Sequence, residues 1–161
     1  MTINQYLCLL EAFKIRRERA FEKYARQLER ATAPTTARID PDGIKSRSGY
    51  NGREDLLIKV AEAAAAEDKA WKQYTAFKKR FEKNLEQLEY SEGLALEIIY
   101  IWNMGKPPEK RRSGVCRWCG CRTKAEAAAL IRQAKQHLTE ILIAQGVEIE
   151  RGSNEQTNNR I

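Results

Sequence analysis

Three of the chain's four cysteines fall within six residues, in the segment Cys116-Arg-Trp-Cys119-Gly-Cys121. A Cys-x-x-Cys pair followed by glycine is typical of a zinc knuckle, in which thiolates bind the metal and the glycine lets the backbone turn. A closed structural zinc site needs four ligands. The sole histidine, His137, lies too far along the following helix to join them, about 20 Å at a rise of about 1.5 Å per residue. Because Cys8 is remote in sequence, the pattern predicts only half of a zinc site.

The interpretation that we favour treats these cysteines as small apolar side chains packed around Trp118. Gly120 then supplies the positive φ of a turn between two helices. On this interpretation the protein needs no cofactor. A zinc ion held by Cys116, Cys119 and Cys121 is the competing hypothesis.

The segment around the cysteines is strongly basic. Between Gly105 and Lys124, seven cations stand against the single acidic residue Glu109, a surplus of +6 in a chain whose formal net charge is +7. In helix-turn-helix proteins, the second helix enters the major groove, and cations at its start bind DNA phosphates. The charge therefore predicts a duplex-DNA surface here. The candidate contact residues in this segment are Lys106, Lys110, Arg111, Arg112, Arg117, Arg122 and Lys124.

The sequence offers little support for catalysis or for membrane insertion. It contains no Gly-rich phosphate loop, no nucleophile elbow and no His-Glu pair at zinc-protease spacing. No run of about 18 apolar residues occurs, and the first residues lack the layout of a signal peptide. We therefore expect a protein without enzymatic activity that works in the cytoplasm of its host cell, away from membranes.

Apolar periodicity predicts that helices position these groups, so the expected fold class is all-α. Two amphipathic helices are predicted on either side of a Pro- and Gly-rich connection at 32–52, with Asn51 and Glu54 as the capping box of the second. Residues 1–90 should then form a long antiparallel helical hairpin, a coiled coil, and a homodimer is also consistent with the pattern. The predicted stripes are Ile3, Leu7, Leu10, Phe21, Tyr24, Leu28 and Ala31 in the first helix, and Leu57, Val60, Ala64, Trp71, Tyr74, Phe81, Leu85 and Leu88 in the second.

Residues 91–146 are predicted to form a small helix-turn-helix-like unit. A short apolar helix begins with Ser91 as N-cap and ends at Gly105 and two prolines. A longer helix opens with the capping box Thr123-x-x-Glu126 and ends near Gly146. Its expected buried positions are Ala127, Leu130, Ile131, Ala134, Leu138, Ile141 and Leu142. Residues 147–161 are expected to be a disordered tail.

Four stretches follow one another in a suggestive order: "IKSRSGYNGRED", the long helix "IKVAEAAAAEDKAWKQYTAFKKRFEKNLEQL", "YIWNMGK" and "LIRQAKQHLTEIL". Over about residues 1–145, this order resembles phage-encoded transcriptional regulators of the ArpU and RinA type, whose C-terminal part is similar to the fourth region of sigma factors. The resemblance implies a DNA-binding transcriptional regulator. Its recognition helix would carry Ile131, Arg132, Gln133, Ala134 and Leu138. The resemblance thus adds Arg132 and Gln133 to the seven candidate contact residues of the basic segment, which makes nine. The segment "PPEKRRSGVCRWCGC" departs from the plain scaffold helix of that family, and about five extra residues precede Arg132.

Three functions from different classes remain open. The first is a phage-type DNA-binding regulator with a sigma-like helix-turn-helix, whose partners would be duplex DNA and RNA polymerase. The second is a phage-encoded coiled-coil protein that binds and inhibits a host nucleic-acid-handling machine, with its basic segment in the nucleic-acid channel. The third is a small metal-binding adaptor organised by the cysteines.

Overall fold

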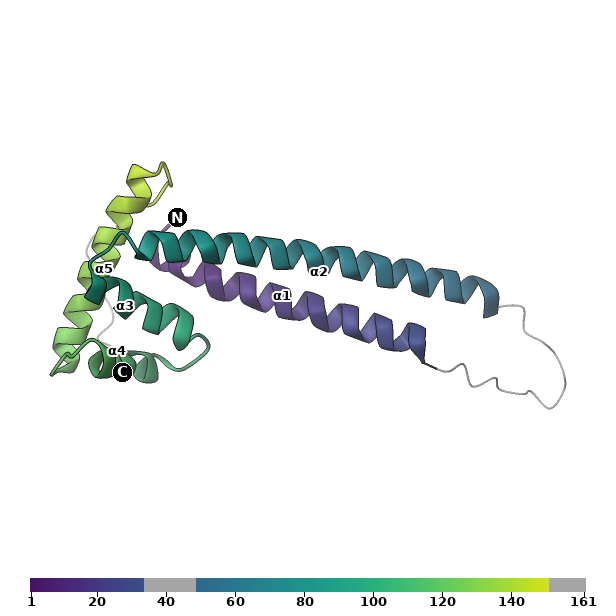
Figure 1. Cartoon of the computed structure of the whole chain (residues 1–161), viewed down its shortest axis with the longest axis horizontal. Helices are drawn as coiled ribbons and strands as arrows, with labels where there is room; N and C mark the ends of the chain where they lie inside the picture. Colours follow the sequence, from purple (N-terminus) through teal and green to yellow (C-terminus); the bar gives the residue numbers. More distant parts are fainter. Residues whose placement is uncertain (34–48, 151–161) are drawn as a thin grey trace. The chain divides into compact units, whose positions relative to one another are not determined.

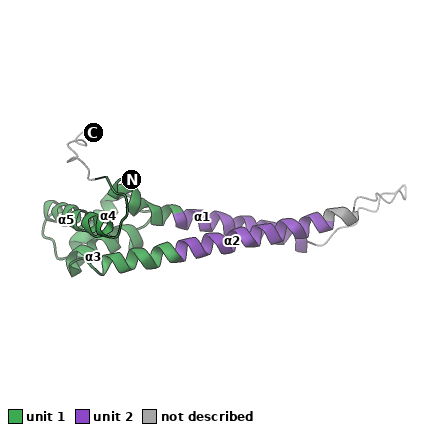
Figure 2. Cartoon of the chain, turned by 90° about the horizontal axis from the view of Figure 1, so that it is seen from above, with its two compact units in different colours: residues 1–12, 76–161 green, residues 13–75 purple. Residues whose placement is uncertain are grey.

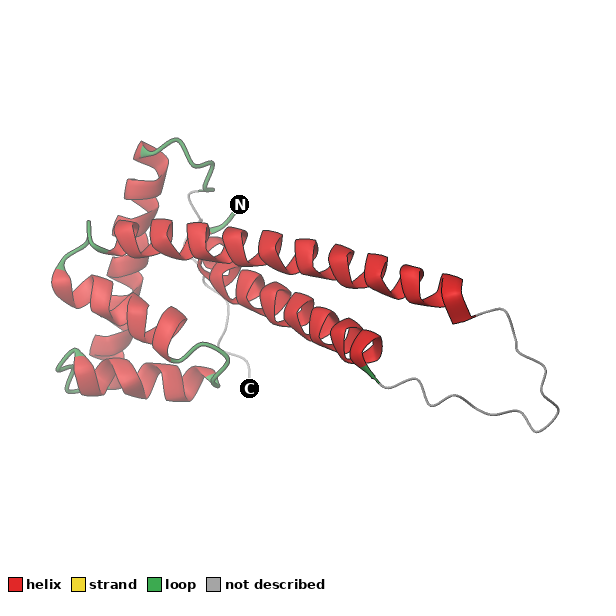
Figure 3. Ribbon diagram, turned by 45° about the vertical axis from the view of Figure 1, so that its right-hand side comes forward, coloured by secondary structure: helices red, strands yellow, loops and turns green. Residues whose placement is uncertain are grey.

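The computed structural model of the chain describes residues 1–33 and 49–150, and every regular element within these ranges is helical (Figure 3). The all-α fold class is therefore confirmed for the described residues. The elements, labelled in Figure 1, are α1 (Ile3–Thr32), α2 (Gly49–Leu85), α3 (Tyr90–Glu97), the π-helical segment η1 (Ile98–Trp102), α4 (Pro108–Trp118) and α5 (Lys124–Ala144). Most of the connection expected at 32–52 lies outside the described residues. Among the described helices, none combines the length and the apolar character that crossing a membrane requires.

The chain divides into two compact units (Figure 2). Unit 2 comprises residues 13–75, and unit 1 comprises residues 1–12 together with the chain from residue 76 onward. The expected boundary near residue 90 differs from this division. The reason is that the first turns of α1 and the last turns of α2 belong to the same compact unit as the C-terminal helices.

Exposure along α1 and α2 follows a heptad pattern, which we call the heptad stripe. The stripe positions alternate steps of three and four, and every one is buried or half-buried. In α1 they are Ile3, Tyr6, Leu10, Phe13, Arg17, Ala20, Tyr24, Gln27 and Ala31; in α2 and just beyond it they are Leu56, Val60, Ala63, Glu67, Ala70, Tyr74, Phe77, Phe81, Asn84 and Leu88.

The sequence-based stripes lie one residue after the heptad stripe at seven places, and at four of these places the residue expected to be buried is exposed. Phe21, Leu28, Leu57 and Trp71 were expected to be buried but are exposed. The residue directly before each of them occupies the heptad stripe instead, as Ala70 does before Trp71. Adjacent residues lie about 100° apart around the helix, so either of two neighbours can continue a stripe of this spacing. Spacing alone therefore did not choose between the large residue and its small neighbour.

Aromatic rings and a buried amide hold together the long-helix ends in unit 1. The Tyr6 ring lies 5.5 Å from the Phe77 ring and 6.3 Å from the Phe81 ring, measured between centroids. Asn84 is buried; its Nδ2 donates to Tyr6 Oη at 3.2 Å, and its Oδ1 accepts from Gln145 Nε2 at 3.0 Å. Because both ends of the amide are bonded, its burial fixes the packing of α1, α2 and the C-cap of α5.

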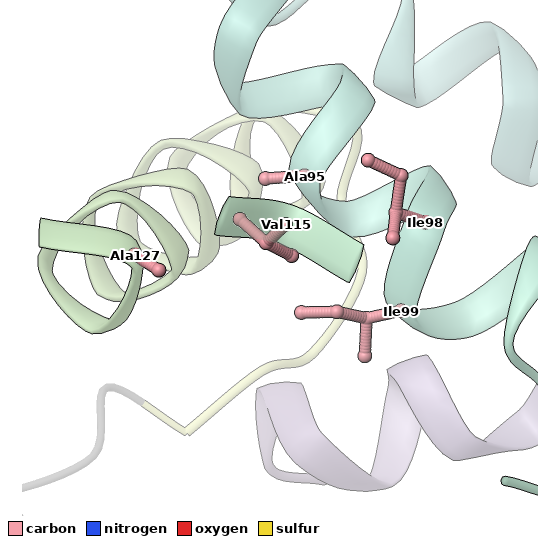
Figure 4. Packing of buried hydrophobic residues seen from close by; sticks show 5 residues of the cluster. All are labelled: Ala95, Ile98, Ile99, Val115 and Ala127. Atoms are coloured by element: carbon pink, nitrogen blue, oxygen red, sulfur yellow. The ribbon is translucent and has the colours of Figure 1, made fainter. Parts of the chain in front are cut away.

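A small apolar cluster joins the C-terminal helices (Figure 4). Its buried members are Ala95 of α3, Ile98 and Ile99 of η1, Val115 of α4 and Ala127 of α5. The helix α4 is a finding that the sequence analysis had not anticipated, because it treated this basic segment as a connection. Pro108 occupies the first position of α4, where the missing N–H removes no intrahelical hydrogen bond.

The helix ends match the expectations at α5 and differ elsewhere. Thr123 Oγ1 accepts from Glu126 N at 3.1 Å, which confirms it as the N-cap. In contrast, α3 begins one residue before Ser91, and α2 begins at Gly49, so Asn51 is not its N-cap. All seven positions expected to be buried in α5 are buried or half-buried.

Part of the expected disordered tail is ordered. Gly146 has a φ of +78° and ends α5 in a Schellman motif, with Val147 N donating to Leu142 O at 2.9 Å. Ile149 is buried, and Glu150 N donates to Met1 O at 3.0 Å. The rest of the expected tail, from residue 151, lies outside the described residues.

Candidate nucleic-acid interface

The two helices that carry most of the candidate contact residues are joined by a short turn. Five residues, 119–123, separate α4 from α5. Gly120 in this turn has a φ of +70°, and a Cβ placed there would meet no atom within 4 Å. The prediction that Gly120 supplies a positive φ is therefore confirmed. Burial of Val115 and Ala127 in the apolar cluster fixes α4 against α5.

Eight of the nine predicted contact residues are exposed. They are Lys106, Lys110, Arg112, Arg117, Arg122, Lys124, Arg132 and Gln133. Arg111 differs, because its Nη2 lies 3.5 Å from Glu11 Oε2 and its Nε donates to Lys106 O at 2.7 Å. The ion pair joins α4 to α1, so Arg111 has a structural role that its place in the basic segment did not predict.

The exposed side of α4 combines cations with aromatic rings. Lys110 and Arg117 are seven residues apart, two helical turns, and so share one face about 10 Å apart along the axis. The Arg117 guanidinium lies 5.8 Å from the centroid of the Trp118 ring. Trp118 in turn meets Trp102 edge-on, with centroids 6.0 Å apart and planes at 90°. Trp118 is 60 % exposed, so the expectation that the cysteines pack around it is wrong.

The cysteines instead pack beside the apolar cluster and bond to backbone carbonyls. Cys116 Sγ donates to Thr123 O and Cys119 Sγ to Ser91 O, each at 3.8 Å. Burial raises the pKa of the Cys119 thiol and of the Cys121 thiol, which favours the neutral form over the thiolate that binds zinc. Within the described ranges, no three His, Cys, Asp or Glu side chains are grouped so that they could hold a metal ion. The described residues thus do not assemble the zinc site considered for Cys116, Cys119 and Cys121.

A buried carboxylate of α3 pairs with the histidine of α5. Glu92 of α3 is only 1 % exposed, and its Oε2 lies 2.9 Å from His137 Nδ1. Its Oε1 has no hydrogen-bond partner among the described residues. The hydrogen bond to Glu92 raises the pKa of His137 above its ordinary value of 6.5. His137 therefore pairs with a structural carboxylate.

We expect the pair to make stability depend on pH. A raised pKa means that the folded chain binds the His137 proton more tightly than the unfolded chain does. The resulting stabilisation is fully present below pH 6.5, the ordinary pKa, and is lost as the pH rises through the raised pKa of the folded state. The free energy of unfolding of the wild type should thus exceed that of His137→Gln most at about pH 5.5 and least at about pH 8.5. Urea titrations at several pH values would measure this difference, and a difference that does not change with pH would contradict the assignment.

A second basic surface, which the sequence analysis missed, lies on α1 in unit 2. Residues 13–32 contain seven cations and three acids. Acidic residues elsewhere offset this surplus, so the net charge of the whole chain did not indicate it. Five of the cations are exposed and follow steps of three and four, which was the signal that could have revealed them. We call Arg16, Arg19, Lys23, Arg26 and Arg30 the basic stripe. A shallow depression runs along it, lined by Arg19, Glu22, Lys23, Arg26, Gln27 and Arg30.

Comparison with known proteins adds no family to this description. No protein-family model matches the chain, and neither the curated proteins nor the solved structures give a match. The argument for a function therefore depends on which charged side chains are exposed and on the elements that hold them.

Proposed function

We propose that this protein is a phage-type DNA-binding transcriptional regulator whose α4–turn–α5 segment acts as a sigma-like helix-turn-helix in the cytoplasm of the host cell. One observation carries the proposal. Two helices joined by a five-residue turn with a left-handed glycine expose seven of the nine predicted contact residues, and the apolar cluster fixes the two helices against each other. RNA polymerase is the protein partner that a sigma-like module would contact.

The proposed roles follow from the position of each side chain. Lys110 and Arg117 on α4, with Arg122 and Lys124 at the start of α5, would neutralise phosphates and release their counterions. Further along α5, Arg132 and Gln133 are exposed. Both side chains can make bidentate contacts to base edges, arginine to guanine and glutamine to adenine. Neighbouring exposed positions are small, Ala125, Ala128 and Ala129, so the first turns of α5 can approach a groove closely.

For the long helices we propose the antiparallel helical hairpin, a coiled coil, that the sequence predicts. The heptad stripes support this proposal, since both helices keep their least exposed residues at coiled-coil spacing. Within unit 2, the Arg17 guanidinium of α1 lies 3.9 Å from the Trp71 ring centroid and 5.6 Å from the Tyr74 ring centroid of α2. A cation over two rings is an attractive contact that helps to pair the two segments.

The alternative function is a phage-encoded coiled-coil protein that binds and inhibits a host nucleic-acid-handling machine. The basic stripe of α1 favours it, because DNA binding by α4 and α5 makes no use of this stripe. A row of cations about 21 Å long, from Arg16 to Arg30, suits the acidic or nucleic-acid surface of such a machine.

Binding to duplex DNA over a series of salt concentrations tests the proposal. The double variant Lys110→Ala, Arg117→Ala should weaken binding. If both cations contact phosphates, it should also flatten the slope of log K against log salt by nearly two, at about 0.9 per contact. The matched control is Arg19→Ala, Lys23→Ala, which removes the same charge from the basic stripe. We expect the control to keep the wild-type slope.

Two outcomes would contradict DNA binding by α4 and α5. One is the absence of duplex binding by the wild type at low salt. The other is an unchanged slope in the Lys110, Arg117 variant, above all if the Arg19, Lys23 control loses the binding instead. Loss of binding in the Arg19, Lys23 control would place the nucleic-acid contact on α1 and favour the alternative function.

A further inference from the structure

Two of the chain's three tryptophans lie against each other on the surface of unit 1. Trp102 is the last residue of η1 and Trp118 the last residue of α4, and they are 49 % and 60 % exposed. Given about 150–250 Å² for a large aromatic side chain, the two together expose on the order of 200 Å². Tryptophan is highly buried on average, so two exposed rings in contact indicate a binding surface. We call Trp102 and Trp118 the tryptophan pair.

The two rings are held in place and leave most of their faces uncovered by each other. Trp102 Nε1 donates to Glu97 Oε1 at 3.0 Å, so the polar edge of this indole is satisfied within the same helical stretch. The ring planes stand at 90°, so the edge of one ring meets the face of the other and covers a single ring face. The exposed fractions of both side chains show that much of the remaining ring surface is open to a further ring.

Cations lie beside the tryptophan pair on α4. The Arg117 guanidinium is 5.8 Å from the centroid of the Trp118 ring. At about 100° per residue, Lys110 and Arg117 lie within about 20° of each other around the helix axis and about 90° from Trp118. Both cations are exposed. They therefore form a row along the side of α4 next to the Trp118 ring. The carboxylate that accepts from Trp102 offsets one of their two charges.

Rings and cations side by side are complementary to a nucleotide whose base is unpaired. A base has a flat face that stacks on an aromatic ring, and the phosphates on either side of it are neutralised by cations. Within a duplex, the faces of paired bases are covered by their neighbours in the stack, so no side chain reaches them. An unpaired base offers its faces, and this makes a single strand the ligand that suits the surface.

We propose that the tryptophan pair stacks on an unpaired base of single-stranded DNA, while Arg117 and Lys110 neutralise the phosphates beside that base. The inference rests on the proposed function, since it uses two cations of the same α4 surface, and it adds unpaired bases to the ligands of that surface. A regulator with such a surface binds a duplex more tightly where its strands are locally open.

Tryptophan fluorescence of the full chain tests the stacking. Trp71→Phe leaves Trp102 and Trp118 as the only tryptophans, so its fluorescence reports on the pair alone. An oligothymidylate of about 20 nucleotides, added at about 50 mM salt, should quench this fluorescence, because a base stacked on an indole ring quenches its emission. The matched control, Trp102→Phe with Trp118→Phe, keeps Trp71 alone. Its fluorescence should stay unchanged at oligothymidylate concentrations at which the strand is bound.

Affinities for the oligothymidylate and for a paired duplex of the same length separate this inference from the proposed function. Trp118→Ala should weaken oligothymidylate binding about five-fold or more and change duplex binding less than about two-fold, because paired bases do not reach the ring. Circular dichroism should show unchanged helix content, since the Trp118 side chain is mostly exposed. The matched control is Tyr90→Ala at the start of α3, where the ring is 85 % exposed, and it should change neither affinity.

Three outcomes would overturn the inference. The first is an equal oligothymidylate affinity in Trp118→Ala and Tyr90→Ala, and the second is an unquenched Trp71→Phe variant at saturating oligothymidylate. The third is a wild type that binds no oligothymidylate at low salt, and duplex binding in the same buffer then decides the proposed function separately. If the oligothymidylate binds through Trp118 while the duplex does not bind, the proposed function fails and the inference holds.

Discussion

Replacing Phe81 with alanine is expected to lower the free energy of unfolding of the full chain by about 3–5 kcal/mol. The Phe81 side chain is completely buried, and its ring packs against those of Tyr6 and Phe77, each with centroids 6.3 Å away. The surroundings are poorly able to collapse into the cavity, because the hydrogen bond from Asn84 holds Tyr6 in place. Chemical denaturation at one fixed protein concentration measures the loss.

Tyr90 provides a matched aromatic control. It begins α3 but is 85 % exposed, so Tyr90→Ala should change the free energy of unfolding by no more than about 0.5 kcal/mol. A loss of less than about 1 kcal/mol for Phe81→Ala would mean that the ring cluster joining α1 to α2 is not formed in solution.

Helix content and helix faces could be predicted from the sequence wherever one local signal decided them. The capping box at Thr123 needs only residues three apart, and it is present with the expected hydrogen bond. The buried face of α5 was predicted because its apolar residues are well separated from its charged ones. Gly120 was identified because few other residues tolerate a positive φ at the end of a helix.

The side of each long helix that is buried could not be predicted, because it depends on the surface that packs against that helix. A stripe that includes Trp71 is more hydrophobic than one that includes Ala70, so the sequence favours the former. Alanine at the stripe lets two helices approach closely, and this leaves Trp71 beside the interface over Arg17. Which of these effects dominates is decided by the geometry of the pair and not by either helix alone.

The candidate site was predictable in its composition and not in its internal bonds. Charged and amide side chains are mostly exposed in folded proteins, so the exposure of eight of the nine residues follows from their type. The exception, Arg111, pairs with Glu11, a residue 100 positions away in sequence. Helix α4 was missed because its glycine and serine weaken the local helical signal, while burial of Val115, a tertiary effect, helps to stabilise it.

Two glycines of the chain should respond differently when each is replaced by asparagine. Gly93 of α3 is buried, and a Cβ placed on it would lie 2.9 Å from the carbonyl oxygen of Leu85, a backbone atom that cannot rotate away. Gly93→Asn should therefore force the start of α3 away from the end of α2, and we expect a loss of at least about 2 kcal/mol in the free energy of unfolding.

Gly120 has a left-handed backbone but open space around it, and asparagine is among the residues that tolerate this conformation. Gly120→Asn should therefore cost less than about 1 kcal/mol. Urea unfolding of the two variants compares a steric requirement at Gly93 with a conformational one at Gly120. Equal losses in the two variants would show that α3 does not approach the Leu85 carbonyl this closely. The small size of Gly93 would then have no role in holding α3, and through it the apolar cluster that fixes α4 against α5.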